Sequence, residues 1–301
     1  MRFGLLGTGY WADTVHAAGL AAHPEVEFAG VWGRDAAKAA TVAERHGTTA
    51  EADLDALLAK VDAVAIALPP DVQAELAYKA VKQGCHLLLE KPLALSVEDA
   101  DRVVAAAESA GVHSVIFFTR RFQEPTADWF DAVVAPTEWH GGNVLWVASI
   151  FTPDNPFGHS AWRKEHGALW DLGPHALAAL LPGLGPVAEV VAERGHDDEV
   201  HLVLRHEAGG ASSATLSLTA APPAQHSTVE FWGPAGIAES PPQELGPATD
   251  ALQRAISALL VAVETGVPHP CDVHFARDIV RVLAAAERFL DRPRESRGER
   301  P

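Results

Sequence analysis

The first twelve residues, Met1–Ala12, read MRFGLLGTGYWA, and the fold of the chain can be worked out from them. Arg2–Leu6 suits a buried strand, and it leads directly into Gly7-Thr8-Gly9-Tyr10-Trp11-Ala12. The small, apolar residues of Asp13–Ala22 then predict a helix. In a G-x-G-x-x-A string, the first glycine permits a tight turn, the second lets a pyrophosphate approach the backbone, and the third small residue allows close packing. The stretch predicts a dinucleotide site, with a plain strand-to-helix turn as the alternative.

The end of the second strand bears on which nicotinamide cofactor such a site would take. Val26–Trp32 is predicted as this strand, and Gly33-Arg34-Asp35 follows it before an alanine-rich helix over Ala36–His46. A carboxylate here grips the ribose 2′-hydroxyl of NAD, whereas a small residue followed by Arg accommodates the 2′-phosphate of NADP. Gly33 with Arg34 therefore favours NADP(H), with NAD(H) as the alternative. Asp35 is open to two roles, contact with the ribose or the cap of the next helix.

Strands and helices alternate with short connections as far as about Thr119. The predicted elements are Asp53–Ala59 (helix), Ala63–Ala67 (strand), Asp71–Gln83 (helix), Cys85–Leu89 (strand), Val97–Ala110 (helix) and Ser114–Phe118 (strand). The strand Ala63–Ala67 is uncharged, which is typical of a parallel strand buried on both faces. This alternation predicts an α/β fold with a doubly wound parallel sheet of the Rossmann type. Leu68 and Pro69 follow a strand and are expected to border the cofactor.

The second half of the chain has a different pattern. Its predicted strands alternate apolar and polar residues, with turns such as Ala208-Gly209-Gly210 between them. The strands are Asn143–Phe151, Val187–Ala192, Glu199–His206, Ser212–Ala220 and His226–Trp232, and the helices are Gly167–Leu181, Ala248–Thr265 and Asp272–Asp291. Consecutive strands with hairpin turns predict a mainly antiparallel open sheet with one exposed face. We expect a dinucleotide-binding domain over residues 1–119 and an α+β substrate-binding and oligomerisation domain over 120–301, whose C-terminal helices are free to pack back on the first domain.

Composition and charge narrow the class of protein. The 301 residues are 48% hydrophobic and 21% charged, no run is long enough to span a bilayer, and no signal peptide is expected. Cys85 and Cys271 are the only cysteines, which rules out a disulfide framework and fits a reducing, cytoplasmic setting. The net charge of −17 without a basic patch argues against nucleic acid or an anionic membrane as partner. The cluster His269-x-Cys271-x-x-His274 lacks a fourth ligand, so no metal site is expected.

Glu90-Lys91-Pro92 is the first candidate for chemistry beyond cofactor binding. It directly follows the apolar strand Cys85–Leu89, at the carboxyl end where ligands bind in open α/β sheets. A cis bond before Pro92 would aim Lys91 into the cleft, where its amine can hold a substrate hydroxyl or carbonyl by a hydrogen bond. The alternative is a surface Glu-Lys pair followed by an ordinary turn proline.

The second candidate lies in the stretch from Trp162 to His175, which reads WRKEHGALWDLGPH. On one helix, Asp171 and His175 are four residues apart and share a face, so they would present a carboxylate and an imidazole together. The alternative is that Asp171 caps a helix kinked at Pro174 and that His175 is an ordinary buried histidine. Trp162 and Trp170 flank this pair and either line a pocket or pack in the core.

These features together resemble the glucose–fructose oxidoreductase / inositol dehydrogenase (Gfo/Idh/MocA) family. The resemblance is carried by Gly7-x-Gly9-x-x-Ala12, Glu90-Lys91-Pro92 and Asp171-Leu172-Gly173-Pro174-His175, in the family's order and spacing. Arg121-Phe122 and Gly266-Val267-Pro268 also look like the family, so the resemblance covers nearly the whole chain. The family often has Asp three residues after the histidine and a glycine triplet before the aspartate. This chain has Ala178 and His166-Gly167-Ala168 there, which puts a particular polyol subgroup in doubt.

The resemblance implies an NAD(P)-dependent oxidoreductase that acts on a hydroxyl or carbonyl carbon of a sugar, cyclitol or related small molecule. Lys91 would bind the substrate and assist proton transfer, and His175, paired with Asp171, would be the general acid/base. Cofactor-binding residues are then Gly7, Thr8, Gly9, Tyr10, Trp11, Ala12, Gly33, Arg34, Leu68, Pro69, Glu90, Lys91 and Pro92. Substrate-binding residues are Lys91, Arg121, Trp162, Arg163, Asp171 and His175.

The resemblance also implies a homodimer or homotetramer, because relatives commonly pair through the exposed sheet face. Two other functions remain open from the residues alone. One is a non-catalytic NAD(P)-binding sensor or regulatory protein, and the other is a reductase of a non-sugar carbonyl or imine.

Overall fold

The computed structural model describes residues 1–134, 137–242 and 246–292, and the chain divides into two compact units. The first unit is formed by residues 1–136 and 240–280, and the second by residues 137–239 and 281–301. The first unit thus runs past residue 119. It includes the helix α10 (Ala248–Thr265), which packs against the strands His86–Leu89 and Ser114–Ile116 and against the helical segment after the glycine turn. The assignment of cofactor binding to residues 1–119 and of substrate binding and oligomerisation to residues 120–301 stays a prediction.

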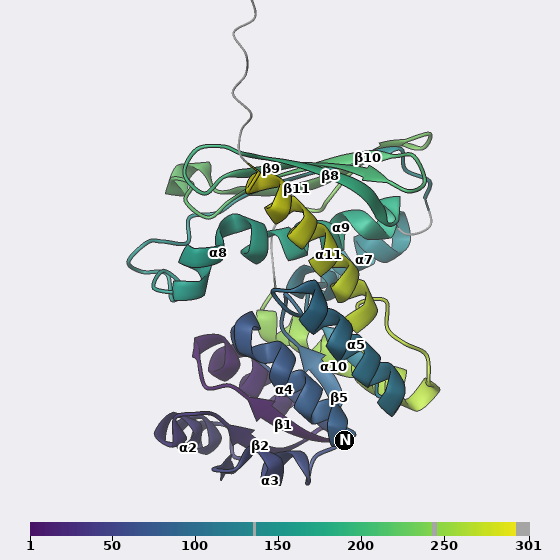
Figure 1. The fold of residues 1–301 in the computed structure, drawn as a ribbon. Helices are drawn as coiled ribbons and strands as arrows, with labels where there is room; N and C mark the ends of the chain where they lie inside the picture. Colours follow the sequence, from purple (N-terminus) through teal and green to yellow (C-terminus); the bar gives the residue numbers. More distant parts are fainter. Residues whose placement is uncertain (135–136, 243–245, 293–301) are drawn as a thin grey trace, which may run out of the picture. The chain divides into compact units, whose positions relative to one another are not determined.

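A six-stranded parallel sheet in the order β3-β2-β1-β4-β5-β6 forms the centre of the first unit (Figure 1). Its strands are β1 (Arg2–Leu6), β2 (Glu27–Trp32), β3 (Ala50–Glu51), β4 (Ala63–Ile66), β5 (His86–Leu89) and β6 (Ser114–Ile116). Every residue of β4 is completely buried, which explains its lack of charge. The predicted doubly wound sheet is confirmed, and only β3, which is two residues long, was not predicted.

The helices of this unit follow the predicted pattern closely. They are η1 (Ala12–Ala17), α1 (Ala18–Ala22), α2 (Ala36–Arg45), α3 (Leu54–Leu58), α4 (Pro70–Lys82), α5 (Val97–Ala110), α6 (Thr119–Phe122), α7 (Glu124–Trp129), η2 (Phe130–Val134) and α10, and α11 (Val273–Leu290) begins in this unit. Ser96 caps α5 by accepting a hydrogen bond from the backbone of Asp99. The helix predicted over Asp13–Ala22 differs in kind, because its first part, η1, is a π-helix.

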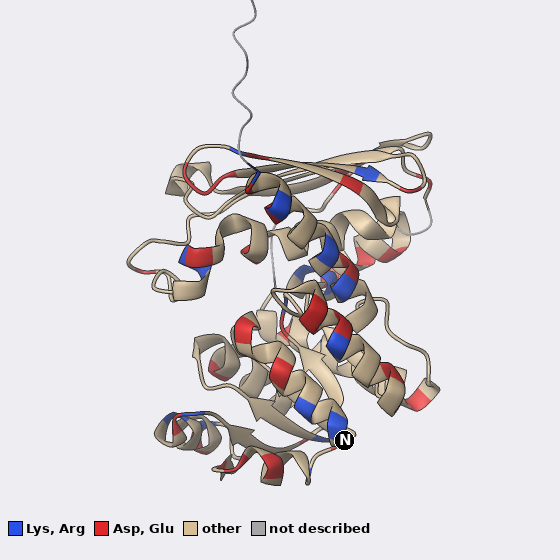
Figure 2. Ribbon diagram, in the orientation of Figure 1, with Lys and Arg blue, Asp and Glu red and all other residues tan. Residues whose placement is uncertain are grey.

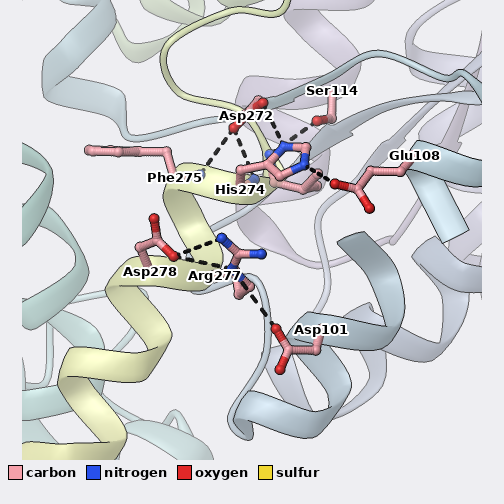
Figure 3. Close-up of polar contacts among 9 residues, drawn as sticks. Asp101, Glu108, Ser114, Asp272, His274, Phe275, Arg277 and Asp278 are labelled. Carbon is pink, nitrogen blue, oxygen red and sulfur yellow. Dashed lines mark hydrogen bonds and ion pairs between the residues drawn. The ribbon is translucent and has the colours of Figure 1, made fainter. Parts of the chain in front are cut away.

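The segment before α11 covers the edge of the parallel sheet. Ile116 N donates to the carbonyl of Cys271 at 2.7 Å, and Val273 N donates to Ser114 Oγ at 3.1 Å. Figure 3 shows the next residue, His274, between Asp272 and Glu108, with 2.9 Å from each ring nitrogen to a carboxylate oxygen. A parallel sheet exposes unpaired backbone groups at its edge, so these contacts satisfy β6 and attach the start of α11 to α5.

The second unit holds a mixed six-stranded sheet in the order β12-β11-β7-β10-β9-β8. Its strands are β7 (Gly141–Val147), β8 (Val187–Arg194), β9 (Val200–His206), β10 (Ala211–Ser217), β11 (His226–Gly233) and β12 (Gly236–Glu239). Neighbouring strands are antiparallel except β7 and β10, which are parallel. The mainly antiparallel sheet is confirmed, and β12 was not predicted.

Two helices cover one face of this sheet: α8 (Ala161–Asp171) contacts β10, and α9 (Gly173–Leu184) contacts β7 and β10. On β9, alternate residues such as Leu202 and Leu204 face the helices and are buried, while Val203 points to the other face and is exposed. The predicted single helix over Gly167–Leu181 is wrong. The range is divided at Leu172, because α8 ends at Asp171 and a separate α9 begins at Gly173, with Pro174 in its first turn. Gly167, the first residue of the predicted range, has φ 61° and ψ −161° and interrupts α8.

Charged residues of both signs are interspersed along α4 and α5 (Figure 2). Arg102 of α5 pairs with Glu75 of α4, and Lys79 lies 3.8 Å from the same carboxylate. Among the residues that the structure describes, no helix is both long enough and apolar enough to cross a membrane.

Candidate active site

The predicted cofactor residues of the first unit gather at one edge of its sheet. The glycine turn, residues 7–12, follows β1, and Gly33 and Arg34 follow β2. Leu68 and Pro69 follow β4, and Glu90-Lys91-Pro92 follows β5. These four strands are neighbours and parallel, so all four turns leave the carboxyl edge. The order of strand addition reverses between β1 and β4, which is where open α/β sheets bind ligands.

The glycine turn has the shape that a pyrophosphate requires. Gly7 has φ 135°, and a Cβ at this position would lie 2.5 Å from the carbonyl oxygen of Ala67. A Cβ at Gly9 would meet no atom within 4 Å, and both Gly9 and Tyr10 are exposed. The first glycine is therefore required by the turn, and the second leaves open space above the backbone where a helical segment begins. The residues present fit a dinucleotide.

The turn after β2 packs directly on the glycine turn. A Cβ at Gly33 would lie 2.6 Å from Thr8 Cγ2, so only glycine fits without displacing Thr8. Arg34 is exposed. Asp35 caps α2, because its Oδ1 accepts hydrogen bonds from Ala37 N and Lys38 N, both at 3.1 Å. Of the two roles left open for Asp35, the structure shows the cap.

Glu90 joins the turn after β5 to the glycine turn. Its Oε1 accepts a hydrogen bond from Trp11 Nε1 at 2.7 Å and lies 2.8 Å from His16 Nε2. The Lys91–Pro92 bond is cis, as the sequence suggested. Pro92 is buried and Lys91 is half-buried. The observed contacts of the Glu90 carboxylate are thus with protein groups, and its assignment to the cofactor stays a prediction.

Gln73 is a residue of this site that sequence reasoning missed. Its amide nitrogen donates to the carbonyls of Glu90 at 2.6 Å and Pro92 at 2.9 Å, and its Oε1 accepts from Glu90 N at 3.0 Å. The side chain is completely buried in the first turn of α4. The signal was a glutamine between Val72 and Ala74, three residues after Pro70 near the start of the helix, because a buried amide must find partners.

Cationic side chains also follow β6, the strand beside β5. Burial lowers the pKa of Arg120 to about 10. The guanidinium of Arg121 lies 4.3 Å from the centre of the Phe130 ring. His269 stacks on Phe122 with 5.5 Å between ring centres, and burial, assisted by the charge of Arg121, lowers its pKa. Arg121 therefore lies at the carboxyl end of the sheet, within an aromatic cluster, and its contact with substrate stays a prediction.

In the second unit, Arg163 and Asp171 form a mostly buried ion pair. Arg163 Nε donates to Asp171 Oδ2 at 2.8 Å, and the two side chains are 17% and 6% exposed. The guanidinium lies 4.7 Å from the Phe157 ring centre and 5.0 Å from that of Trp162. Trp162 is half-buried, and its ring centre lies 6.4 Å from that of His166. Arg163 was predicted to bind substrate, and the structure shows it bound to Asp171.

His175 lies in the first turn of α9 and is half-buried. Its ring lies against Trp146 of β7, with 5.1 Å between ring centres and 34° between planes. Asp171 is the last residue of α8, and only Leu172, whose backbone is also right-handed helical, separates it from α9, so the shared face of Asp171 and His175 stays a prediction. Trp170 is buried in the core and donates to Glu287 Oε1 at 2.8 Å, so it packs rather than lines a pocket.

The residues of the metal-like cluster have other partners. His269 Nδ1 accepts a hydrogen bond from Cys271 N at 3.0 Å, and His274 is bound by Asp272 and Glu108. Burial raises the pKa of the Cys271 thiol to about 11, which disfavours the thiolate that zinc requires.

Comparisons with known proteins agree with this geometry. Residues 1–118 match the family model of Gfo/Idh/MocA oxidoreductases with an NAD-binding Rossmann fold, and residues 140–239 match the model of the Gfo/Idh/MocA C-terminal domain. D-xylose 1-dehydrogenase (NADP(+)) 2 of Haloferax volcanii is 30% identical over 95% of this chain and 96% of its own length.

Two solved structures share the fold over nearly the whole chain. UDP-N-acetylglucosamine 3-dehydrogenase of Acidithiobacillus ferrooxidans superposes with a TM-score of 0.81 and 22% identity, covering 96% of this chain and 97% of that one. GenD2 from gentamicin A biosynthesis, solved in complex with NAD, superposes with a TM-score of 0.81 and 21% identity, covering 96% and 93%.

Proposed function

This chain belongs to the Gfo/Idh/MocA family of oxidoreductases, and from that premise we propose that it transfers a hydride between NADP(H) and a sugar, a cyclitol or a related small molecule. The reacting centre is a hydroxyl or carbonyl carbon. The observation that carries the proposal is the glycine turn, with Gly7 in a conformation that suits glycine and open space above Gly9. A hydrogen bond from Trp11 to Glu90 joins this turn to the one that bears Lys91.

Residues of the first unit would hold the cofactor. Gly7, Gly9 and Ala12 would receive the pyrophosphate, since their lack of bulk allows the backbone to approach it. Arg34 would contact the 2′-phosphate, because it is exposed after β2 while Asp35 is occupied as a cap. Leu68, Pro69 and Glu90-Lys91-Pro92 follow the neighbouring strands and would border the cofactor. The Haloferax volcanii relative is itself named for NADP(+).

Lys91 and His175 would act on the substrate, and Asp171 would assist His175. When bound, the nicotinamide supplies the chemistry of hydride transfer. Lys91 holds the reacting oxygen by a hydrogen bond, and His175 takes the hydroxyl proton or returns it, because an imidazole exchanges protons near neutral pH. Asp171 is held by Arg163 directly before α9, and this ion pair fixes the start of the helix that carries His175.

The first test is a calorimetric titration of the purified protein with NADPH, NADP⁺, NADH and NAD⁺. We expect the phosphorylated pair to bind on the order of tenfold more tightly, as a charge-assisted contact from Arg34 to the 2′-phosphate requires. Preference for NAD(H) would overturn the cofactor assignment alone. No binding of any of the four would overturn the proposed function.

The second test is turnover of a panel of sugars and cyclitols with the preferred cofactor. Lys91→Ala and His175→Ala are each expected to lower kcat by about 10²-fold or more, because each removes a group that handles the reacting proton or its oxygen. Cofactor affinity is expected to stay within about threefold of wild type, a difference of about 0.65 kcal/mol. Full activity in both variants would contradict these roles. Cofactor binding without turnover of any panel member would favour the non-catalytic sensor.

We also propose a homodimer or homotetramer that pairs through the open face of the second sheet, in a reducing, cytoplasmic setting. That face exposes Val203, Trp232 and Ile237, which are 56%, 43% and 80% accessible, and both cysteines of the chain are free. Ile237→Lys with Val203→Lys is expected to lower the molar mass measured by light scattering. Val261→Lys, at an exposed apolar position on α10, is the matched control. An unchanged mass in the double variant would contradict this assembly.

A further inference from the structure

One carboxylate oxygen binds two side chains that follow the glycine turn. Glu90 Oε1 accepts from Trp11 Nε1 at 2.7 Å and lies 2.8 Å from His16 Nε2. His16 is completely buried, and the Glu90 side chain is 13% exposed. Because an ionised carboxylate only accepts hydrogen bonds, His16 Nε2 carries the proton in this contact. Both contacts are therefore charge-assisted and largely removed from water, which makes them stronger than neutral hydrogen bonds.

The π-helix η1 explains how Trp11 and His16 reach the same oxygen. In an α-helix, residues five apart in sequence point about 140° away from each other around the axis. The i→i+5 bonding of a π-helix brings such residues close to one another on one face. Trp11 directly precedes η1, and His16 lies within it. A hydrogen bond from Thr14 Oγ1 to the carbonyl of Tyr10, at 2.7 Å, also stabilises the start of η1.

The backbone on both sides of Lys91 is held as well. Gln73 bonds Glu90 through both the backbone N–H and the carbonyl of that residue, and it bonds the carbonyl of Pro92. Lys91 lies between these two residues. Its backbone is therefore tied to α4 through Gln73 and to η1 through the Glu90 side chain.

We propose that Glu90 is a positioning residue that couples the glycine turn to Lys91, so that the dinucleotide-binding turn and the substrate-binding lysine keep one relative position. This rests on the proposed function, in which the glycine turn binds NADPH and Lys91 assists turnover. Glu90 acts through Trp11, His16 and the backbone of Lys91, and it is distinct from the groups that touch the reacting atoms.

The binding arm of the test is a double-mutant cycle followed by titration with NADPH. Glu90→Gln replaces the charged acceptor, and Trp11→Phe removes one donor. Each is expected to raise Kd on the order of tenfold, and the double variant no more than the worse single variant. Both substitutions act on the same charge-assisted contact, since Glu90→Gln removes the charge of the acceptor and Trp11→Phe removes the donor. Independent, additive effects would overturn the coupling, and so would two single variants that bind like wild type. Glu75→Gln, an exposed carboxylate of α4 paired with Arg102, is the control.

The turnover arm asks whether Glu90 acts through Lys91. Glu90→Gln is expected to lower kcat on the order of tenfold in the wild-type background and to cause no further loss in Lys91→Ala. An equal loss in both backgrounds would overturn the coupling. Full turnover in Lys91→Ala would instead contradict the proposed function, while the binding arm would still decide the coupling. Thermal unfolding shows whether Glu90→Gln is folded. If it is not, Trp11→Phe combined with Lys91→Ala provides the same turnover cycle. Trp11→Phe combined with His16→Asn then provides the binding cycle.

Discussion

Three consecutive residues after β2 show how one turn divides its tasks among neighbouring side chains. Gly33 makes room for Thr8 of the glycine turn, Arg34 points to solvent, and Asp35 holds the first backbone N–H groups of α2. The Asp35 carboxylate, the candidate for contact with an NAD ribose, therefore binds the backbone of α2 instead. An acidic residue at position 33 would collide with Thr8, because a Cβ at this position would lie 2.6 Å from Thr8 Cγ2.

These contacts predict different effects for three substitutions at the turn after β2. Arg34→Ala is expected to weaken NADPH binding on the order of tenfold and to leave NADH binding unchanged, because only the 2′-phosphate contact is lost. Asp35→Ala is expected to lower the free energy of unfolding by about 1 kcal/mol through loss of the cap, with the same cofactor preference. Gly33→Asp is expected to weaken both cofactors, because Thr8 must move. Calorimetry and urea unfolding measure these effects, and a clean switch to NADH in Gly33→Asp would contradict this account.

At the scale of elements, the interrupted helix α8 creates a contact that a straight helix forbids. Eight residues span about 12 Å along an α-helix, so Arg163 and Asp171 of one regular helix would lie far apart. The interruption at Gly167 brings the guanidinium to 2.8 Å from the carboxylate, between the Phe157 and Trp162 rings. The kink is thus stabilised by an ion pair and by aromatic contacts.

Breaking this pair on one side is expected to be costly. Arg163→Met would remove the guanidinium that binds the mostly buried Asp171 carboxylate, and a loss of about 3 kcal/mol in unfolding free energy is expected. Arg163→Met with Asp171→Leu should recover most of it, since two apolar groups can replace a buried pair. Gly167→Ala should cost about 1–2 kcal/mol because its φ is 61°. Urea unfolding at pH 7 measures the free energy of unfolding of all three variants. A loss below about 0.5 kcal/mol in Arg163→Met would contradict this prediction, because a loss that small is typical of an exposed ion pair.

At the scale of the whole molecule, histidines determine how stability responds to pH. Burial lowers the pKa of His23, His86, His206 and His269. At His274 burial opposes protonation, but hydrogen bonds to Glu108 and Asp272 outweigh it and raise the pKa (Figure 3). The unfolded chain binds protons with a pKa of about 6.5 at each site. The four lowered groups therefore stabilise the fold above that pH and lose this contribution on acidification, whereas His274 stabilises it below and loses its contribution as pH rises.

Four histidines with a lowered pKa oppose one with a raised pKa. The free energy of unfolding is therefore expected to fall as the pH is lowered from 7.5 to 5.5. Within the second unit, His206 Nδ1 donates a hydrogen bond to the carbonyl of Gly185 at 2.8 Å, and its Nε2 accepts one from Ser212 Oγ at 2.7 Å. In His206→Gln the difference between the two pH values should shrink, and in His274→Gln it should grow, because a compensating group is removed. Urea unfolding of the three proteins at both pH values tests this. Greater stability of the wild-type protein at pH 5.5 would contradict the assignment.

Much of the fold follows from the sequence alone. The bounds of β1, α5 and α10 match their predictions, and the alternation of elements specified the parallel sheet, because hydrophobic periodicity and capping residues act between near neighbours. The glycine turn and Glu90-Lys91-Pro92 were found for the same reason, since each motif lies at the end of a predicted strand. A strand of two residues, β3, is too short to show any period.

The tertiary structure alone decided which polar groups meet. Glu90 and Trp11 are 79 residues apart in sequence, and Gln73 and Glu90 are 17 apart, so no local pattern encodes their hydrogen bonds. The π-turn of η1 is likewise supported by the contact of His16 with Glu90, and the interruption of α8 at Gly167 by the Arg163–Asp171 pair and the ring of Phe157. Periodicity specifies which face of an element is buried, but a hydrogen bond requires two atoms within about 3 Å, and only the folded chain sets that distance.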